Sequence, residues 1–230
     1  MNIFARIFEK GDYIYCISCR RKKKSDCFFV TDGGAGICTE CADKLHFTRS
    51  EATFDAAPPL AYIISPLEYK GAAVKILRDF KFSGKFKNGD ILTKILTNFL
   101  CDFSFSESFT RTVPVPLSTA RLKERGYNQS EILARGIAKC MGVPLDTDVL
   151  IRTRNTERQS SLSNAYRAAN VKNAFAATEL LKGEKIILVD DIYTTGCTLK
   201  SCAEALIYAG AEKVIGITAA RALPKNRRLN

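Results

Sequence analysis

The segment 186–198 constrains the fold and chemistry of this chain more than any other part. It reads Ile-Ile-Leu-Val-Asp-Asp-Ile-Tyr-Thr-Thr-Gly-Cys-Thr and is followed by an apolar pattern of helical period. The four apolar residues predict a fully buried strand, and the two acids would lie where that strand ends. A helix that begins after the loop would direct free backbone N–H groups and the positive end of its dipole toward an anion. The segment therefore predicts a strand, a loop and a helix that together hold a phosphate.

The acidic pair and the threonine loop indicate what kind of phosphate is bound. Neighbouring carboxylates can accept hydrogen bonds from vicinal ribose hydroxyls. Along its whole length, the segment resembles the motif with which type I phosphoribosyltransferases bind phosphoribosyl pyrophosphate (PRPP). The acids could instead only cap and solvate the end of the strand. A P-loop nucleotidase would need a G-x-x-x-x-G-K-[ST] segment, which this sequence lacks.

Composition sets the broad class. With 230 residues, of which 46% are apolar, the chain can form one α/β domain and a small appendage. No stretch is long enough to predict a membrane span, and residues 1–15 lack the apolar core of a signal peptide. We therefore expect a cytoplasmic protein whose nine cysteines are metal ligands or core residues rather than disulfides. The net charge of +11 favours polyanionic partners, although a basic surface can also serve only solubility.

Two Cys-x-x-Cys pairs near the N-terminus predict a metal site. They are Cys16 with Cys19 and Cys38 with Cys41, and residues 20–37 separate them. Two such turns can supply the four thiolates of a closed, structural Zn²⁺ site, although redox-active dithiols are an alternative. The only histidine, His46, follows the second pair, and we expect it to be structural.

A run of cations follows the first cysteine pair. It consists of Arg20, Arg21, Lys22, Lys23 and Lys24, and two phenylalanines come shortly after it. Cations beside aromatic rings suit single-stranded nucleic acid, through phosphate contacts and base stacking. The alternative is a solvated loop, with the phenylalanines packing inside the small metal module.

The apolar pattern and the turn-forming residues divide the chain into a metal module at 1–50, a linker at 51–59 and an α/β domain at 60–230. Strands are predicted at 60–64, 112–116, from Ile186, and at 214–219, and helices within 66–80, 91–99, 130–141 and 198–209. This alternation predicts a mostly parallel sheet with helices on both faces. Ligands bind beyond the carboxyl ends of such strands. Pro116 and Asp190 both fall at these ends.

Several further segments carry a family resemblance. They are Leu-Arg-Asp-Phe-Lys-Phe at 77–82, Val-Pro-Val-Pro-Leu at 113–117, Arg-Gly-Tyr-Asn-Gln-Ser at 125–130, and the segments 152–162 and 167–170. With the four-cysteine module and the PRPP motif, they resemble the ComF family over almost the whole chain. The resemblance implies a type I phosphoribosyltransferase fold behind a zinc-ribbon-like module. It also implies a role in natural transformation, in which incoming single-stranded DNA is handled in the cytoplasm beside a helicase-like competence ATPase.

The resemblance also assigns the site residue by residue. Asp190 and Asp191 would bind the ribose hydroxyls and are the candidate catalytic residues. The PRPP-binding set comprises Val115, Pro116, Leu117, Arg121, Lys123, Arg125, Asp190, Asp191, Ile192, Tyr193, Thr194, Thr195, Gly196, Cys197 and Thr198. The segment with Arg121, Lys123 and Arg125 would cover the pyrophosphate, or would be only an exposed helix face. Mg²⁺ would bridge pyrophosphate and ribose oxygens.

Three hypotheses of function remain open at this point. The chain could be a PRPP-dependent glycosyltransferase that releases pyrophosphate, with an acceptor that the sequence does not identify. It could bind PRPP only as a regulatory signal, or retain the site as a relic. It could also be a DNA-binding adaptor in which the zinc module and the basic surface act.

Overall fold

The computed structural model describes residues 13–24, 28–30, 36–48, 55–82, 87–102, 105, 107–153 and 174–222. Residues 51–54 of the expected linker lie outside these ranges. So do residues 154–162 and 167–170, on which part of the family resemblance rests. Across the described ranges, no helix combines the length and the apolar character needed to cross a membrane.

The centre of the molecule is a mostly parallel sheet with the strand order β5-β6-β12-β11-β8. Its strands are β5 (Asp55–Ala57), β6 (Leu60–Ile64), β8 (Arg111–Pro114), β11 (Lys185–Tyr193) and β12 (Lys213–Arg221). Only β5 runs antiparallel to its neighbour, and the short β7 (Leu67–Glu68) adds a further parallel pairing to β12. In the register of β11 with β8, Val189 lies opposite Pro114. The end of β8 therefore lies beside the point in β11 where the acidic pair begins, so the two predicted site segments meet at this edge of the sheet.

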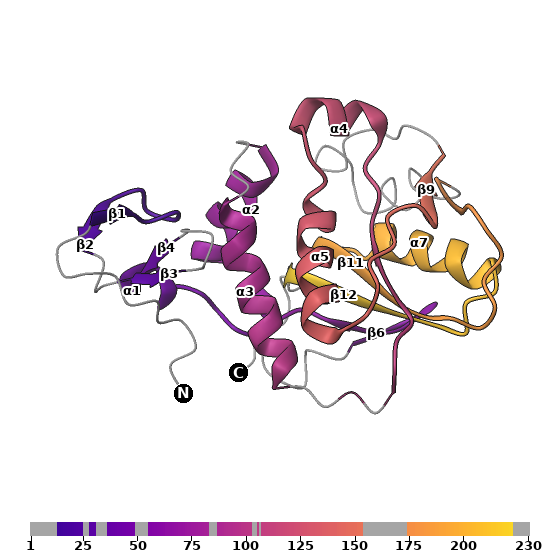
Figure 1. Ribbon diagram of the computed structural model, residues 1–230. Coiled ribbons are helices and arrows are strands. Elements are labelled where there is room, and N and C mark those ends of the chain that lie inside the picture. Colours follow the sequence, from indigo (N-terminus) through magenta and orange to yellow (C-terminus); the bar gives the residue numbers. More distant parts are fainter. Residues whose placement is uncertain are drawn as a thin grey trace.

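Helices cover both faces of the sheet (Figure 1). The helices α2 (Ala72–Phe82), α3 (Lys87–Cys101) and α5 (Gln129–Met141) share one apolar core, and α7 (Cys197–Tyr208) belongs to a second. The small pair β9 (Leu150–Arg152) and β10 (Phe175–Ala177) packs with α7. In β11, Ile187 faces the first core and Leu188 the second. Burial on both faces explains why this strand is an uninterrupted apolar run.

The metal module consists of two antiparallel hairpins and a short helix. Its elements are β1 (Tyr13–Tyr15), β2 (Lys22–Lys24), β3 (Phe28–Val30), β4 (Gly36–Cys38) and α1 (Thr39–Ala42). Figure 1 shows the module lying beside α2. Ile37 belongs to the same apolar core as Ile76 of α2, and the backbone N–H of Ala72 donates to the carbonyl of Lys44 over 3.2 Å. The module is therefore packed against the α/β domain.

The element boundaries depart from the prediction in three informative places. β11 continues through both acids to Tyr193, because β12 pairs with it as far as Arg221. Residues 22–24 form strand β2 rather than a loop, since they pair with β1. Part of the expected linker, residues 55–57, forms β5 against β6. In each case a hydrogen-bonded neighbour extended the regular structure.

Candidate functional site

A cavity of about 320 Å³ opens at the carboxyl ends of β8 and β11. Fourteen of the fifteen residues proposed from sequence to bind PRPP line it: Val115, Pro116, Leu117, Arg121, Arg125 and all nine residues 190–198. The exception is Lys123, which is exposed on α4 (Thr119–Arg125) and is not among the lining residues. Segments more than sixty residues apart in the chain therefore meet around one hollow.

The two acids have different partners. Asp191 is 5% exposed, and its Oδ1 lies 2.9 Å from Nζ of Lys81 at the end of α2. Oδ1 of Asp190 accepts hydrogen bonds from the hydroxyl of Ser130 and from the backbone N–H of Asp191, both over 2.9 Å. Burial, and then the neighbouring Asp191 carboxylate, raise the pKa of Asp190 to about 6. Asp191 therefore has a cation beside it, whereas the protonation of Asp190 changes near pH 6.

The loop after β11 exposes the N-terminus of a helix to the cavity. Gly196 is the N-cap of α7, with φ of 76°, and no side chain caps the helix there. A Cβ atom at this position would lie 2.5 Å from a ring carbon of Tyr193. Both the left-handed backbone and the close ring require glycine. The uncapped amides of α7 and the positive end of its dipole favour an anion at this point.

Among the described residues, five cations line the same cavity as the acids. Arg78, Lys81, Arg121, Arg125 and Arg152 all line the cavity. Arg125 is held by a 2.9 Å hydrogen bond to Oε1 of Gln129, and its guanidinium lies 5.0 Å from the centre of the Phe82 ring. Burial, and then the charge of Arg121, lower the pKa of Arg152. Such a concentration of positive charge suits a ligand with several anionic groups.

The segment 125–130 connects the walls of the cavity. The hydroxyl of Tyr127 donates a short hydrogen bond to the carbonyl of Phe80 in α2. Asn128 donates to the carbonyl of Val115 over 3.1 Å and, as the N-cap of α5, accepts from the N–H of Ser130 over 3.1 Å. Ser130 in turn donates to Asp190. The segment therefore fixes α2, the turn after β8 and the acids relative to one another.

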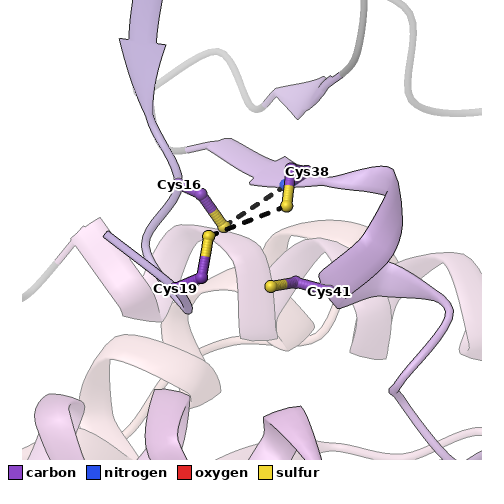
Figure 2. Close-up of side chains that lie close together, drawn as sticks. All are labelled: Cys16, Cys19, Cys38 and Cys41. Carbon is purple, nitrogen blue, oxygen red and sulfur yellow. Dashed lines mark hydrogen bonds between the residues drawn. The ribbon is translucent and has the colours of Figure 1, made fainter. Parts of the chain in front are cut away.

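The four cysteines of the metal module form the only group of metal-binding side chains found among the described residues. The sulfurs of Cys16, Cys19, Cys38 and Cys41 all lie within 4.8 Å of one another and converge on one point (Figure 2). The sulfurs of Cys19 and Cys38 are 3.9 Å apart, close to the edge of about 3.8 Å expected for a tetrahedron with Zn–S bonds of about 2.3 Å. The four thiols fit Zn²⁺, and exposed His46 is not part of the group.

Comparison with known proteins supports the family resemblance that was drawn from the sequence. A family model described as the phosphoribosyl transferase domain matches residues 126–228. The chain is 33% identical over 144 residues to "Competence protein ComFC" of Bacillus subtilis, covering 62% of this chain and 56% of that protein. It is 28% identical over 214 residues to "DNA utilization protein YhgH" of Escherichia coli K12, covering 89% and 88% of the two chains. To the protein of the same name from Salmonella typhi it is 31% identical over 160 residues, covering 68% and 70%.

The chain belongs to the ComF family. The family resemblance drawn from the sequence is thereby confirmed, and so is the type I phosphoribosyltransferase fold behind a four-cysteine module. This ComF protein is a competence-related, phosphoribosyltransferase-like protein.

Sequence reasoning missed three of the five cavity cations of this ComF protein. Arg78 and Lys81 lie in the segment 77–82, and Arg152 begins the segment 152–162; both segments carry the family resemblance. Their positions depend on where α2 and β9 end in space, which sequence spacing does not reveal. All three cations belong to segments that carry the family resemblance, so membership of those segments was the sequence signal that could have identified them.

The basic run of the ComF module is largely paired with acids. Arg20 donates to Asp79 over 2.8 Å. Arg21 makes a short ion pair with Glu40, and Nζ of Lys23 lies 2.9 Å from the same carboxylate. Lys22 is exposed, and the side chain of Lys24 lies outside the described residues. Any polyanion that used the whole run would have to compete with these carboxylates.

Proposed function

We propose that this ComF protein binds PRPP with Mg²⁺ in the cavity and acts in natural transformation, handling incoming single-stranded DNA in the cytoplasm. The observation that carries PRPP binding is the convergence at one end of the sheet of an acidic pair, an uncapped helix N-terminus and, among the described residues, five cations. These are the groups needed by a ligand that combines a ribose diol, a 5′-phosphate and a pyrophosphate.

The geometry suggests one orientation for the ligand. The 5′-phosphate would bind the loop 194–198, where the amides of α7 are free of side-chain caps. The ribose hydroxyls would donate to Asp190 and Asp191. The pyrophosphate would then lie by the turn 115–117, within reach of Arg121 and Arg125.

The acids also bear on the metal that accompanies PRPP. Mg²⁺, when bound, would neutralise charge on the pyrophosphate and ribose oxygens. Asp191 is already paired with Lys81, and Asp190 with Ser130. We therefore expect the ligand and water to supply most of the oxygens around the ion, with Asp190 and Asp191 as the nearest protein carboxylates.

A glycosyltransferase reaction would use the same groups. Breaking the bond between C1′ and pyrophosphate places positive charge on the sugar ring and negative charge on the leaving group. Asp190 and Asp191 would stabilise the positive charge on the sugar ring, and Arg121 and Arg125 would stabilise the negative charge on the pyrophosphate. Release of pyrophosphate in a screen of bases and amines would show turnover, whereas binding without release would favour a regulatory or relic site.

The test of the cavity is thermal unfolding with and without PRPP and Mg²⁺. A ligand that binds only the folded state raises Tm by mass action. We expect the double variant Asp190→Asn, Asp191→Asn to lose the shift. The control Asp43→Asn, Asp102→Asn makes the same change of charge at two exposed acids and should keep it. An undiminished shift in the first variant would refute the site.

The DNA role is supported by the net charge of +11 and by the names of the relatives, which refer to DNA utilization and competence. Residues 20–24 are the proposed contact, and a helicase-like competence ATPase the proposed partner. Binding of labelled oligo(dT) should weaken steeply with salt, and Lys22→Ala, Lys24→Ala should reduce the slope of log K against log salt by about 1.4. The control Lys139→Ala, Lys182→Ala should leave the slope unchanged. Absent or salt-insensitive binding would contradict the DNA role.

A further inference from the structure

Two cysteines lie together far from the metal module and outside the cavity. Cys101 is the last residue of α3, and Cys140 lies in the last turn of α5. Their sulfurs are 3.5 Å apart, and both residues are exposed. Neither belongs to the four-thiol group or lines the cavity at the strand ends. A bonded pair of sulfurs needs about 2.0 Å, so only a small approach separates these thiols from a disulfide.

The packing of α3 against α5 keeps the two thiols facing each other. One turn before Cys140, Gly136 meets Thr93 so closely that a Cβ atom there would lie 2.1 Å from the Thr93 methyl group. One turn before Cys101, the carbonyl of Thr97 lies 3.8 Å from the sulfur of Cys140. The close approach of Gly136 to Thr93 thus holds the two helices together without the thiols, and the Thr97 carbonyl contacts the Cys140 thiol beside Cys101.

The pair is open to a reagent. Cys101 and Cys140 line a separate cavity of about 460 Å³, together with Phe105, Glu107 and others. Burial, and then the hydrogen bond with Cys101, raise the pKa of Cys140 to about 11. Cys140 therefore keeps its proton near neutral pH, and we assign the first attack on an oxidant to the sulfur of Cys101.

We propose that Cys101 and Cys140 form a reversible intramolecular disulfide with a small disulfide oxidant such as oxidised glutathione. The Cys101 thiolate attacks one sulfur of the oxidant, which forms a mixed disulfide and releases one glutathione thiolate. Cys140 then loses its proton and attacks the sulfur of Cys101, which releases the second glutathione. The two protein thiols lose two electrons and two protons, and the oxidant becomes two molecules of reduced glutathione.

The bond would close a loop around one wall of the PRPP cavity. Residues 102–139 contain β8, the turn 115–117, α4 and the first turns of α5. A cross-link at the base of this segment reduces the freedom of its unfolded state. Oxidation should therefore stabilise the segment that carries Arg121, Arg125 and Ser130.

The experiment incubates the full-length, metal-replete protein with oxidised glutathione and then digests it with trypsin without reduction. We expect a mass loss of two hydrogens, a disulfide between peptides 95–111 and 140–152, and a Tm higher by about 5–10 °C. Reduction should reverse all three. Cys101→Ser and Cys140→Ser should each abolish the linked peptides, whereas Cys27→Ser, which retains both helix-end thiols, should form them.

Three outcomes would overturn the proposal. The first is oxidised protein that carries only glutathione adducts at Cys101 or Cys140. The second is protein whose mass oxidised glutathione leaves unchanged. The third is a disulfide that forms only after zinc has been removed and that joins metal-module cysteines. None of these depends on PRPP, so the result is independent of the proposed ligand.

Discussion

Arg20 of the metal module donates a hydrogen bond to Asp79 of α2, with 2.8 Å between the guanidinium nitrogen and the carboxylate oxygen. Asp79 is 4% exposed and stands two residues before Lys81, which pairs with Asp191 in the cavity. Helix α2 therefore contacts the metal module through Asp79 and the cavity through Lys81. The module is joined to the helix end that forms the cavity wall.

Replacing Arg20 tests this connection. Arg20→Ala removes a cation from a buried carboxylate, and since the arginine is itself largely exposed we expect a loss of about 1–2 kcal/mol in the free energy of unfolding. The control is Arg135→Ala, which breaks an exposed i,i+4 ion pair with Glu131 and should cost less than about 0.5 kcal/mol. Urea denaturation measures both. Equal losses would show that the Arg20–Asp79 contact is no more than a surface pair.

Ser130 should tune the pH dependence of PRPP binding. The pKa of Asp190 is raised to about 6, and the hydrogen bond from Ser130 opposes that rise. An ionised carboxylate accepts more strongly from ribose hydroxyls than a protonated one, so affinity should be highest well above pH 6 and fall as the pH drops through 6. Ser130→Ala removes the donor, raises the pKa of Asp190 further, and should move the midpoint of this loss to higher pH.

Titration calorimetry at several pH values measures the two profiles. PRPP has ionisations of its own, but they contribute equally to the wild-type and variant curves, so the displacement between the curves reports the protein. Superimposable curves would show that the hydrogen bond from Ser130 does not set the pH dependence of PRPP binding.

Gly196→Ala should damage the phosphate loop specifically. The added Cβ meets the Tyr193 ring at 2.5 Å, and the backbone has φ of 76°. We expect a fall in stability of about 1–2 kcal/mol and at least a tenfold loss of PRPP affinity. Gly142→Ala is a matched control, because its φ is 66° and no atom lies within 4 Å of the added Cβ. Gly142→Ala should lose stability for the same backbone reason but bind PRPP normally. Equal losses of PRPP affinity in both variants would argue against a role for the loop.

The four-cysteine group should hold one zinc ion per chain. Elemental analysis of purified protein should find it, and Cys38→Ser should lose it, because three thiolates leave a structural site incomplete. Loss of zinc should also lower Tm, since binding energy of this kind is folding energy. Cys101→Ser, a thiol outside the group, should keep the metal. Full zinc content in Cys38→Ser would refute the site.

The sequence allowed the central strands β6, β8, β11 and β12, the helices α2, α3, α5 and α7 and the grouping of the four cysteines to be predicted, because each depends on a local pattern. The apolar run Ile186–Val189, followed at once by two acids and a turn, is typical of a strand buried on both faces, and the two Cys-x-x-Cys spacings suit one tetrahedral ion. The ion pair between Lys81 and Asp191 could not be predicted, because it depends on where α2 ends in space. Lys123 illustrates the converse: its neighbours Arg121 and Arg125 line the cavity, but helical periodicity in α4 directs it elsewhere.

The position of β12 between β6 and β11 has a consequence for the protein as it leaves the ribosome. β6 emerges early, yet its parallel neighbour is the last strand to be made. Until then β6 can pair only with β5, and the edge that carries Ile63 and Ile64, both buried in the finished molecule, stays open. Such nascent edges attract chaperones or neighbouring chains. Stalled nascent chains that end before residue 213 should accordingly be digested by protease within β6, whereas chains that extend beyond β12 should resist.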